Sequence, residues 1–215
     1  MDLMARLTKI EQGFGRLDAS DSCWHIGEFQ SHGGWSAGET NQQIKNLKIE
    51  VPVPPNRKRY KDEAVRYWGG KLAECLSADA IRRDVTFVPA PCSKPVGHAE
   101  YDDRIRRVLD DLAGRIGVLD IRELVVTHTE RQAQHKGEHR SSPAELLQTL
   151  RLNPAALQLP LRPIVLILDD VFTQGSTFRA LKTLITPVHG VQEVGGIFLA
   201  RTVWPKPPEI VLPVF

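Results

Sequence analysis

The stretch IVLILDDVFTQGSTFRAL, residues 164–181, is the most informative part of this sequence. It begins with a continuous apolar run, 164–168, of the kind found in strands that are buried on both faces of a parallel sheet. Two adjacent carboxylates, Asp169 and Asp170, follow this run, and a short segment of hydroxyl and glycine residues comes next. Phe178 and Leu181 then begin an apolar helical face. The stretch therefore predicts a buried strand, a polar loop and a helix, with two acids at the carboxyl end of the strand.

The same alternation of strand and helix continues on the N-terminal and C-terminal sides of this stretch. Helical spacing of apolar residues, or short apolar runs typical of strands, occur at 60–76, 85–88, 102–117, 121–126 and 194–200. Such alternation predicts an α/β protein with a parallel sheet and right-handed crossovers. Ligands of these sheets bind beyond the carboxyl ends of the strands. We therefore expect the functional site at the end of the strand that carries Asp169 and Asp170.

The bulk composition is that of an ordinary globular protein. The chain has 215 residues, of which 41% are hydrophobic and 25% are charged, and its formal net charge of +2 is too small to indicate nucleic-acid binding by itself. Three widely spaced cysteines favour neither a disulfide framework nor a thiolate zinc site. The first residues do not resemble a signal peptide, and no apolar run reaches the ~18–20 residues of a membrane span. We expect a cytoplasmic protein without a membrane partner.

The loop after the acidic pair has the chemistry of a phosphate site. Its residues combine hydroxyl donors, a glycine that lets a ligand approach the backbone, and unpaired N–H groups at a helix start. These residues are Thr173, Gln174, Gly175, Ser176 and Thr177. The loop is neither a Walker loop nor a dinucleotide-binding turn, because it matches neither glycine pattern. Since the carboxylates precede the loop, they could accept hydrogen bonds from two vicinal ribose hydroxyls, or hold Mg²⁺ that bridges to them.

The segment VLILDDVFTQGST closely resembles the phosphoribosyl pyrophosphate (PRPP) motif of type I phosphoribosyltransferases. The resemblance covers about thirteen residues and departs from the family at Gln174, where a small hydroxyl residue is usual. It implies the parallel α/β fold of that family with a small irregular cap or hood. It also implies that Asp169 and Asp170 hold the ribose and its Mg²⁺, while residues 173–177 hold the 5-phosphate.

The resemblance implies two further parts of the site. A second loop should bind the leaving pyrophosphate, and FVPAPCSKPVGH fits it with Ser93 and Lys94. A mobile basic loop should close over the sugar, and Arg131 in the polar segment 127–150 is the expected catalytic cation; a solvated basic loop is an equally good interpretation. Scattered residues around Arg131 also resemble the competence-protein-F-like (ComF-like) branch of the fold.

We expect three regions along the chain. Residues 1–59 form a short amphipathic helix, within the first 20 residues, and a loop-rich cap with short strands. Residues 60–203 form the phosphoribosyltransferase-like core, and residues 204–215 form a tail that can add a hood strand. In the family the hood covers the acceptor base, which Trp204 and Trp35 could stack on. Aromatic residues that simply anchor the cap to the sheet are the competing interpretation.

The expected activity is transfer of a phosphoribosyl group from PRPP, bound with Mg²⁺, to a nitrogenous acceptor with release of pyrophosphate. The alternative is a regulator that senses PRPP or a nucleotide on the same fold without turnover, and some regulators of this kind bind nucleic acid. A homodimer is compatible with this sequence.

Overall fold

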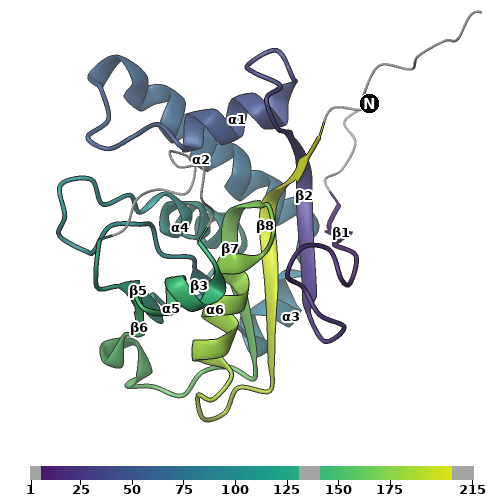
Figure 1. Ribbon diagram of the computed structural model, residues 1–215, viewed down its shortest axis with the longest axis vertical. Coiled ribbons are helices and arrows are strands. Elements are labelled where there is room, and N and C mark those ends of the chain that lie inside the picture. The colour runs from purple at the N-terminus through teal and green to yellow at the C-terminus, as the bar shows by residue number, and fades with distance from the viewer. Residues whose placement is uncertain (1–5, 131–140, 205–215) are drawn as a thin grey trace, which may run out of the picture.

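The computed structural model describes residues 6–130 and 141–204, which build an α/β structure around one mostly parallel sheet (Figure 1). Its six strands lie in the order β1-β2-β8-β7-β3-β4. These strands are β1 (Thr8–Lys9), β2 (Ser22–Gln30), β3 (Val85–Pro89), β4 (Asp120–Ile121), β7 (Ile164–Phe172) and β8 (Glu193–Val203). Each neighbouring pair is parallel except β1 with β2, which is antiparallel. The parallel sheet predicted from the sequence is confirmed.

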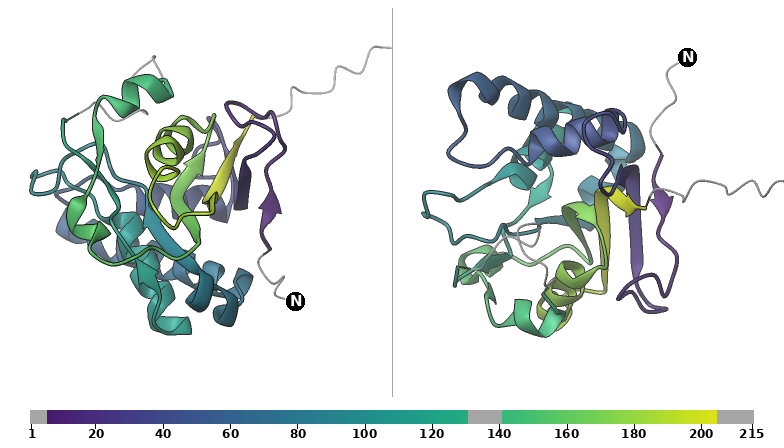
Figure 2. Two further views of the ribbon diagram at one scale, coloured as in Figure 1. Left: turned by 90° about the horizontal axis from the view of Figure 1, so that it is seen from below. Right: turned by 45° about the horizontal axis from the view of Figure 1, so that its top comes forward.

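Helices cover both faces of this sheet, as the two views of Figure 2 show. One face carries α1 (Glu39–Leu47), α2 (Pro55–Cys75), α3 (Ala78–Asp84) and α4 (Arg104–Ile116). The other face carries α6 (Ser176–Ile185), α5 (Pro143–Leu147), the short helix Pro154–Leu157, and a two-stranded antiparallel sheet of β5 (Val125–Thr127) and β6 (Leu150–Leu152). The layers are held together because the central strands are apolar on both sides.

Two hydrophobic clusters, one on each face of the sheet, account for the helix positions. Ile167 of β7 packs with Phe178 and Leu181 of α6, whereas the next residue, Leu168, packs with the α2 and α4 cluster. Successive side chains of a strand point to opposite faces, so the continuous apolar run of β7 serves both clusters. The helical stripes predicted at 60–76 and 102–117 correspond to α2 and α4, which bury Trp68 and Leu109.

The N-terminal segment differs from the sequence-based expectation. Residues 6–20 contain no helix; they form β1 and turns, and the buried Ile10 donates its N–H to the carbonyl of Cys23 at 2.8 Å. Residues 22–30 are a nine-residue strand of the main sheet, rather than short strands of a separate cap. The error arose because the many polar residues and glycines of this segment concealed strand pairing with β8, which is non-local. The division into hood and core stays a prediction.

The strand predicted at 121–126 is interrupted. Its first part belongs to β4 of the main sheet, and its last part belongs to β5 of the small sheet. Between them Arg122 bonds through its side chain to the carbonyls of Ala156, Leu159 and Pro160, and through its N–H to Phe87. The N–H of Arg122 therefore still bonds to β3 of the main sheet, and the chain leaves that sheet after Arg122. Among residues 6–130 and 141–204, no helix has the length and apolar character that crossing a bilayer requires.

The order of the strands creates a switch point between β3 and β7. The connection that leaves β3 leads through α4 to β4 at one edge, whereas the connection that leaves β7 leads through α6 to β8 on the other side. In open parallel sheets, the loops that leave two such strands diverge and open a crevice at the carboxyl edge. The loops after β3 and β7 therefore lie where this fold class binds ligands.

Candidate functional site

The loop between β7 and α6 lines a pocket at the carboxyl edge of the sheet. The pocket and the solvent-open space in front of it measure about 360 Å³. Its walls combine one acid, the hydroxyl residues of the loop and three aromatic rings. They are Asp169, Val171, Phe172, Thr173, Gln174, Gly175, Ser176, Thr177, Phe178 and Phe198. All five residues that the sequence assigned to phosphate binding thus surround one hollow together with Asp169.

The helix start in this pocket has the geometry of an anion site. Gly175 has φ 80° and immediately precedes α6, and no side chain of the described residues caps the helix. The first backbone N–H groups of α6 have no partner within the helix and carry the positive end of its dipole. On the neighbouring strand, the Thr202 hydroxyl lies 3.4 Å from that of Thr173. An oxyanion of the size of phosphate is the group that such an arrangement binds.

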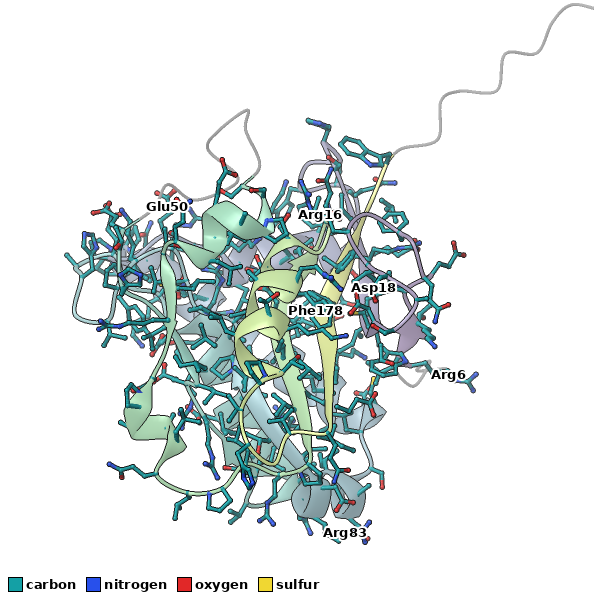
Figure 3. The ribbon with its side chains drawn as sticks, turned by 60° about the horizontal axis from the view of Figure 1, so that its bottom comes forward. Arg6, Arg16, Asp18, Glu50, Arg83 and Phe178 are labelled. Carbon is teal, nitrogen blue, oxygen red and sulfur yellow. The ribbon has the colours of Figure 1, made fainter. Side chains whose placement is uncertain are left out.

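A loop from the N-terminal segment packs against the outside of this turn. Arg16 donates its N–H to the carbonyl of Gln174 at 2.8 Å, and Asp18 pairs with Arg179 of α6. Figure 3 shows Arg16 and Asp18 beside the helix that carries Phe178. The turn is therefore supported by a segment far away in the sequence, while its inner side faces the pocket.

The two acids of the motif face opposite sides of the sheet. Asp169 lines the pocket with the loop, on the side of α6. Asp170 pairs instead with Lys48, which follows α1, at 2.9 Å and with Arg104 of α4 at 2.7 Å. The alternation of side chains along a strand imposes this separation on adjacent residues. Only Asp169 therefore shares the pocket with the phosphate loop.

The two carboxyl groups also differ in their protonation. Burial away from water is the main cause that raises the pKa of Asp169 to about 7, and the nearby charge of Asp170 is the second. The N–H of Asp170 donates to Oδ1 of Asp169 at 2.8 Å, which lowers this pKa in part. Burial alone would also raise the pKa of Asp170, but Lys48 and Arg104 lower it well below the ordinary value. Asp169 can therefore exchange a proton near neutral pH, whereas Asp170 stays ionised.

Asp170 belongs to a chain of alternating charges that the sequence reading missed. Arg104 donates from Nε and Nη2 to Oδ2 of Asp170, at 3.0 and 2.7 Å, and from Nη1 to Oδ2 of Asp102 at 2.8 Å. The same oxygen of Asp102 accepts from the buried Lys61 at 2.8 Å. Arg104 could have been found from the sequence, since a helix that follows a strand in this topology begins at the carboxyl edge.

The loop after β3, where pyrophosphate binding was expected, lies across the switch point from β7. Ser93 and Lys94 are in this loop, but Lys94 forms ion pairs with Glu100 at 3.2 Å and with Glu130. The hydrogen bond that Lys94 donates to Glu130 raises the pKa of Lys94. Lys94 can bind an anionic ligand only if the ligand replaces Glu100 and Glu130 as its ion-pair partners.

The residues expected to contact an acceptor lie apart from the pocket walls. Trp204 follows β8, is 61% exposed, and has its ring centroid 6.1 Å from that of His32. Trp35 is 50% exposed. Neither is among the residues that line the pocket of Asp169. Arg131 and the tail 205–215 lie outside the described residues.

The residues present fit a magnesium ion that arrives with a phosphorylated substrate. Asp169 offers a carboxylate next to hydroxyl oxygens, and Mg²⁺ usually takes one or two carboxylates together with substrate phosphates. Both oxygens of Asp170 already have cationic partners. Within the described ranges, no group of three or more His, Cys, Asp or Glu side chains is arranged to hold a metal ion.

A comparison with models of known protein families found no match to this chain, and a comparison with curated proteins found none either.

Proposed function

We propose that this chain binds the ribose 5-phosphate part of PRPP in the pocket between β7 and α6, and that it is a phosphoribosyltransferase. The observation that carries the proposal is the shared pocket of Asp169 and residues 173–177 at an uncapped helix start. The 5-phosphate accepts hydrogen bonds from the backbone N–H groups and hydroxyls of the loop. Asp169 lies on the strand side of that site, where it can accept from a ribose hydroxyl.

The transfer itself needs positioning and charge stabilisation more than covalent help from the protein. An acceptor nitrogen forms a bond to C1 of the sugar while pyrophosphate leaves with the electrons of the C1–O bond. Mg²⁺, when bound with PRPP, would neutralise negative charge on the pyrophosphate and contact Asp169. The protein residues hold the sugar and phosphates in line, which lowers the barrier by fixing the orientation of the reactants.

A PRPP sensor without turnover is the second candidate, and one observation favours it. Asp170 has Lys48 and Arg104 as partners, and Lys94 has Glu100 and Glu130, so groups expected to touch the substrate are engaged within the protein. A sensor needs only the phosphate pocket, whereas a transferase needs these groups to exchange partners during turnover.

Two measurements on purified protein test these functions. Isothermal titration with PRPP and Mg²⁺ should give saturable binding, and Asp169→Asn should weaken it at least tenfold. The matched control is Asp110→Asn, because Asp110 lies on the exposed side of α4 and pairs only with Arg106 among the ion pairs of the described residues. Release of pyrophosphate with a panel of nitrogenous bases indicates the transferase, and binding without release indicates the sensor. Absence of PRPP binding rejects both.

A further inference from the structure

The charge chain around Arg104 contains more positive than negative groups. Three cations, Lys48, Arg104 and Lys61, share two carboxylates, Asp170 and Asp102. The side chains of Asp170 and Lys61 are only 8% and 2% exposed. Asp169, directly before Asp170, also interacts with Lys48 and Arg104, so the cations outnumber the ionised acids only while Asp169 is protonated. Because unpaired charge is costly where solvent is excluded, that state of the cluster favours one more anion.

Arg104 lies at the switch point between β3 and β7. It is the first residue of α4, directly after the loop that leaves β3, and it spans from that helix to Asp170 at the end of β7. Its partner Asp102 adjoins the same loop, where its N–H lies 3.5 Å from Sγ of Cys92. The Arg104 side chain is 20% exposed, so solvent reaches part of it. Arg104 therefore links the two loops that flank the crevice.

We propose that Arg104 binds the pyrophosphate group of the substrate, and that it releases Oδ2 of Asp170 for a ribose hydroxyl when it does so. This proposal rests on the proposed function. A guanidinium group binds phosphate oxygens in a bidentate manner, so the leaving group can replace the carboxylate of Asp170 as its partner. The exchange leaves no charge unpaired, since Lys48 remains on Oδ1 of Asp170 and Asp102 remains on Nη1 of Arg104.

The exchange would let both acids of the motif contact the ribose, although only Asp169 lines the pocket before binding. Before binding, Lys48 and Arg104 together keep Asp170 ionised although it is buried. A ligand without pyrophosphate cannot draw Arg104 away, so it meets only Asp169 and the phosphate loop. A ligand with both groups recruits Asp170 as well. Arg104 thereby makes the site selective for a sugar phosphate that carries a second, anionic leaving group.

The test compares three ligands, ribose 5-phosphate, pyrophosphate with Mg²⁺, and PRPP with Mg²⁺, by isothermal titration. For Arg104→Gln we expect at least a tenfold loss of affinity for pyrophosphate and for PRPP, while ribose 5-phosphate binds within threefold of the wild type. Arg115→Gln is the matched control, because Arg115 lies near the other end of α4 and pairs with Asp111. Equal losses for all three ligands, or no loss for any, would overturn the exchange.

A second measurement needs no variant that removes the charge. The Nε–H of Arg104, which donates to Asp170, should give a nitrogen-proton NMR signal that is assigned by its disappearance in Arg104→Lys. Pyrophosphate with Mg²⁺ should shift this signal in the wild type, and ribose 5-phosphate should not. If the wild type binds ribose 5-phosphate but pyrophosphate with Mg²⁺ does not shift the Arg104 signal, the role of Arg104 is rejected while the proposed function stands. If the wild type binds no ribose 5-phosphate and no PRPP, both are rejected.

Discussion

Arg104 donates two hydrogen bonds to a single carboxylate oxygen of Asp170, at 2.7 and 3.0 Å, and joins the start of α4 to the end of β7. The bond spans 66 positions of the sequence. It crosses the switch point between β3 and β7, where parallel sheets bind their ligands. The same contact therefore stabilises this edge of the sheet and determines whether Oδ2 of Asp170 is available to a ligand.

Replacing Asp170 should destabilise the protein. Asp170→Asn leaves Lys48 and Arg104 with an uncharged partner in a buried position, and breaking a buried ion pair costs about 3–5 kcal/mol. Urea unfolding measures this loss. Asp110→Asn, at an exposed pair, should change the free energy of unfolding by less than about 1 kcal/mol. A neutral or stabilising effect of Asp170→Asn would show that Asp170 is repelled by Asp169 more than it is held by its cations.

Replacing Gly175 should damage both the turn and the pocket. Its φ of 80° costs a residue with a side chain about 1–2 kcal/mol, and an added Cβ would lie 3.0 Å from the ring of Phe172. We expect Gly175→Ala to lower the free energy of unfolding by at least about 1 kcal/mol and to weaken ribose 5-phosphate binding. Gly114→Ala is the control of opposite sign. It lies on an exposed part of α4 with nothing near its Cβ, so it should stabilise the helix.

The protonation of Asp169 should make stability depend on pH. Because the pKa of Asp169 is raised in the folded state, the folded protein binds this proton more tightly than the unfolded chain does. The protonated Asp169 therefore stabilises the folded state fully below the ordinary pKa of aspartate, near 4. This stabilisation is lost as the pH rises through about 7. Asp169→Asn should remove this component, which is seen by comparing urea unfolding at pH 4 and pH 7. An identical pH profile in the two proteins would contradict the raised pKa.

The elements next to the motif could be predicted because their signals are local. The apolar run before Asp169 and the apolar spacing from Phe178 onward correctly indicated β7 and α6. The strand is longer than the apolar run and includes both acids, since β8 pairs with it as far as Phe172. The loop residues 173–177 could be predicted as one group for the same reason, because they are consecutive.

The rest depends on contacts between distant segments. β2 was missed because its pairing with β8, rather than its own polar composition, makes it a strand. The cations of Asp170 were missed because Lys48 and Arg104 reach it from the end of α1 and the start of α4, which are distant in the sequence. The structure shows that the two acids face opposite sides of the sheet, that the charge of Asp170 nevertheless raises the pKa of Asp169, and that Asp170 is held by two cations.

The most direct test is a nitrogen-proton NMR titration of the wild-type protein with ribose 5-phosphate. If residues 173–177 hold the phosphate, the backbone N–H signals of Gln174, Gly175, Ser176 and Thr177 should shift together and saturate at one dissociation constant. Signals from the far end of α6 should hardly move. Saturating shifts confined to another surface, or no shifts at millimolar ligand, would contradict the account.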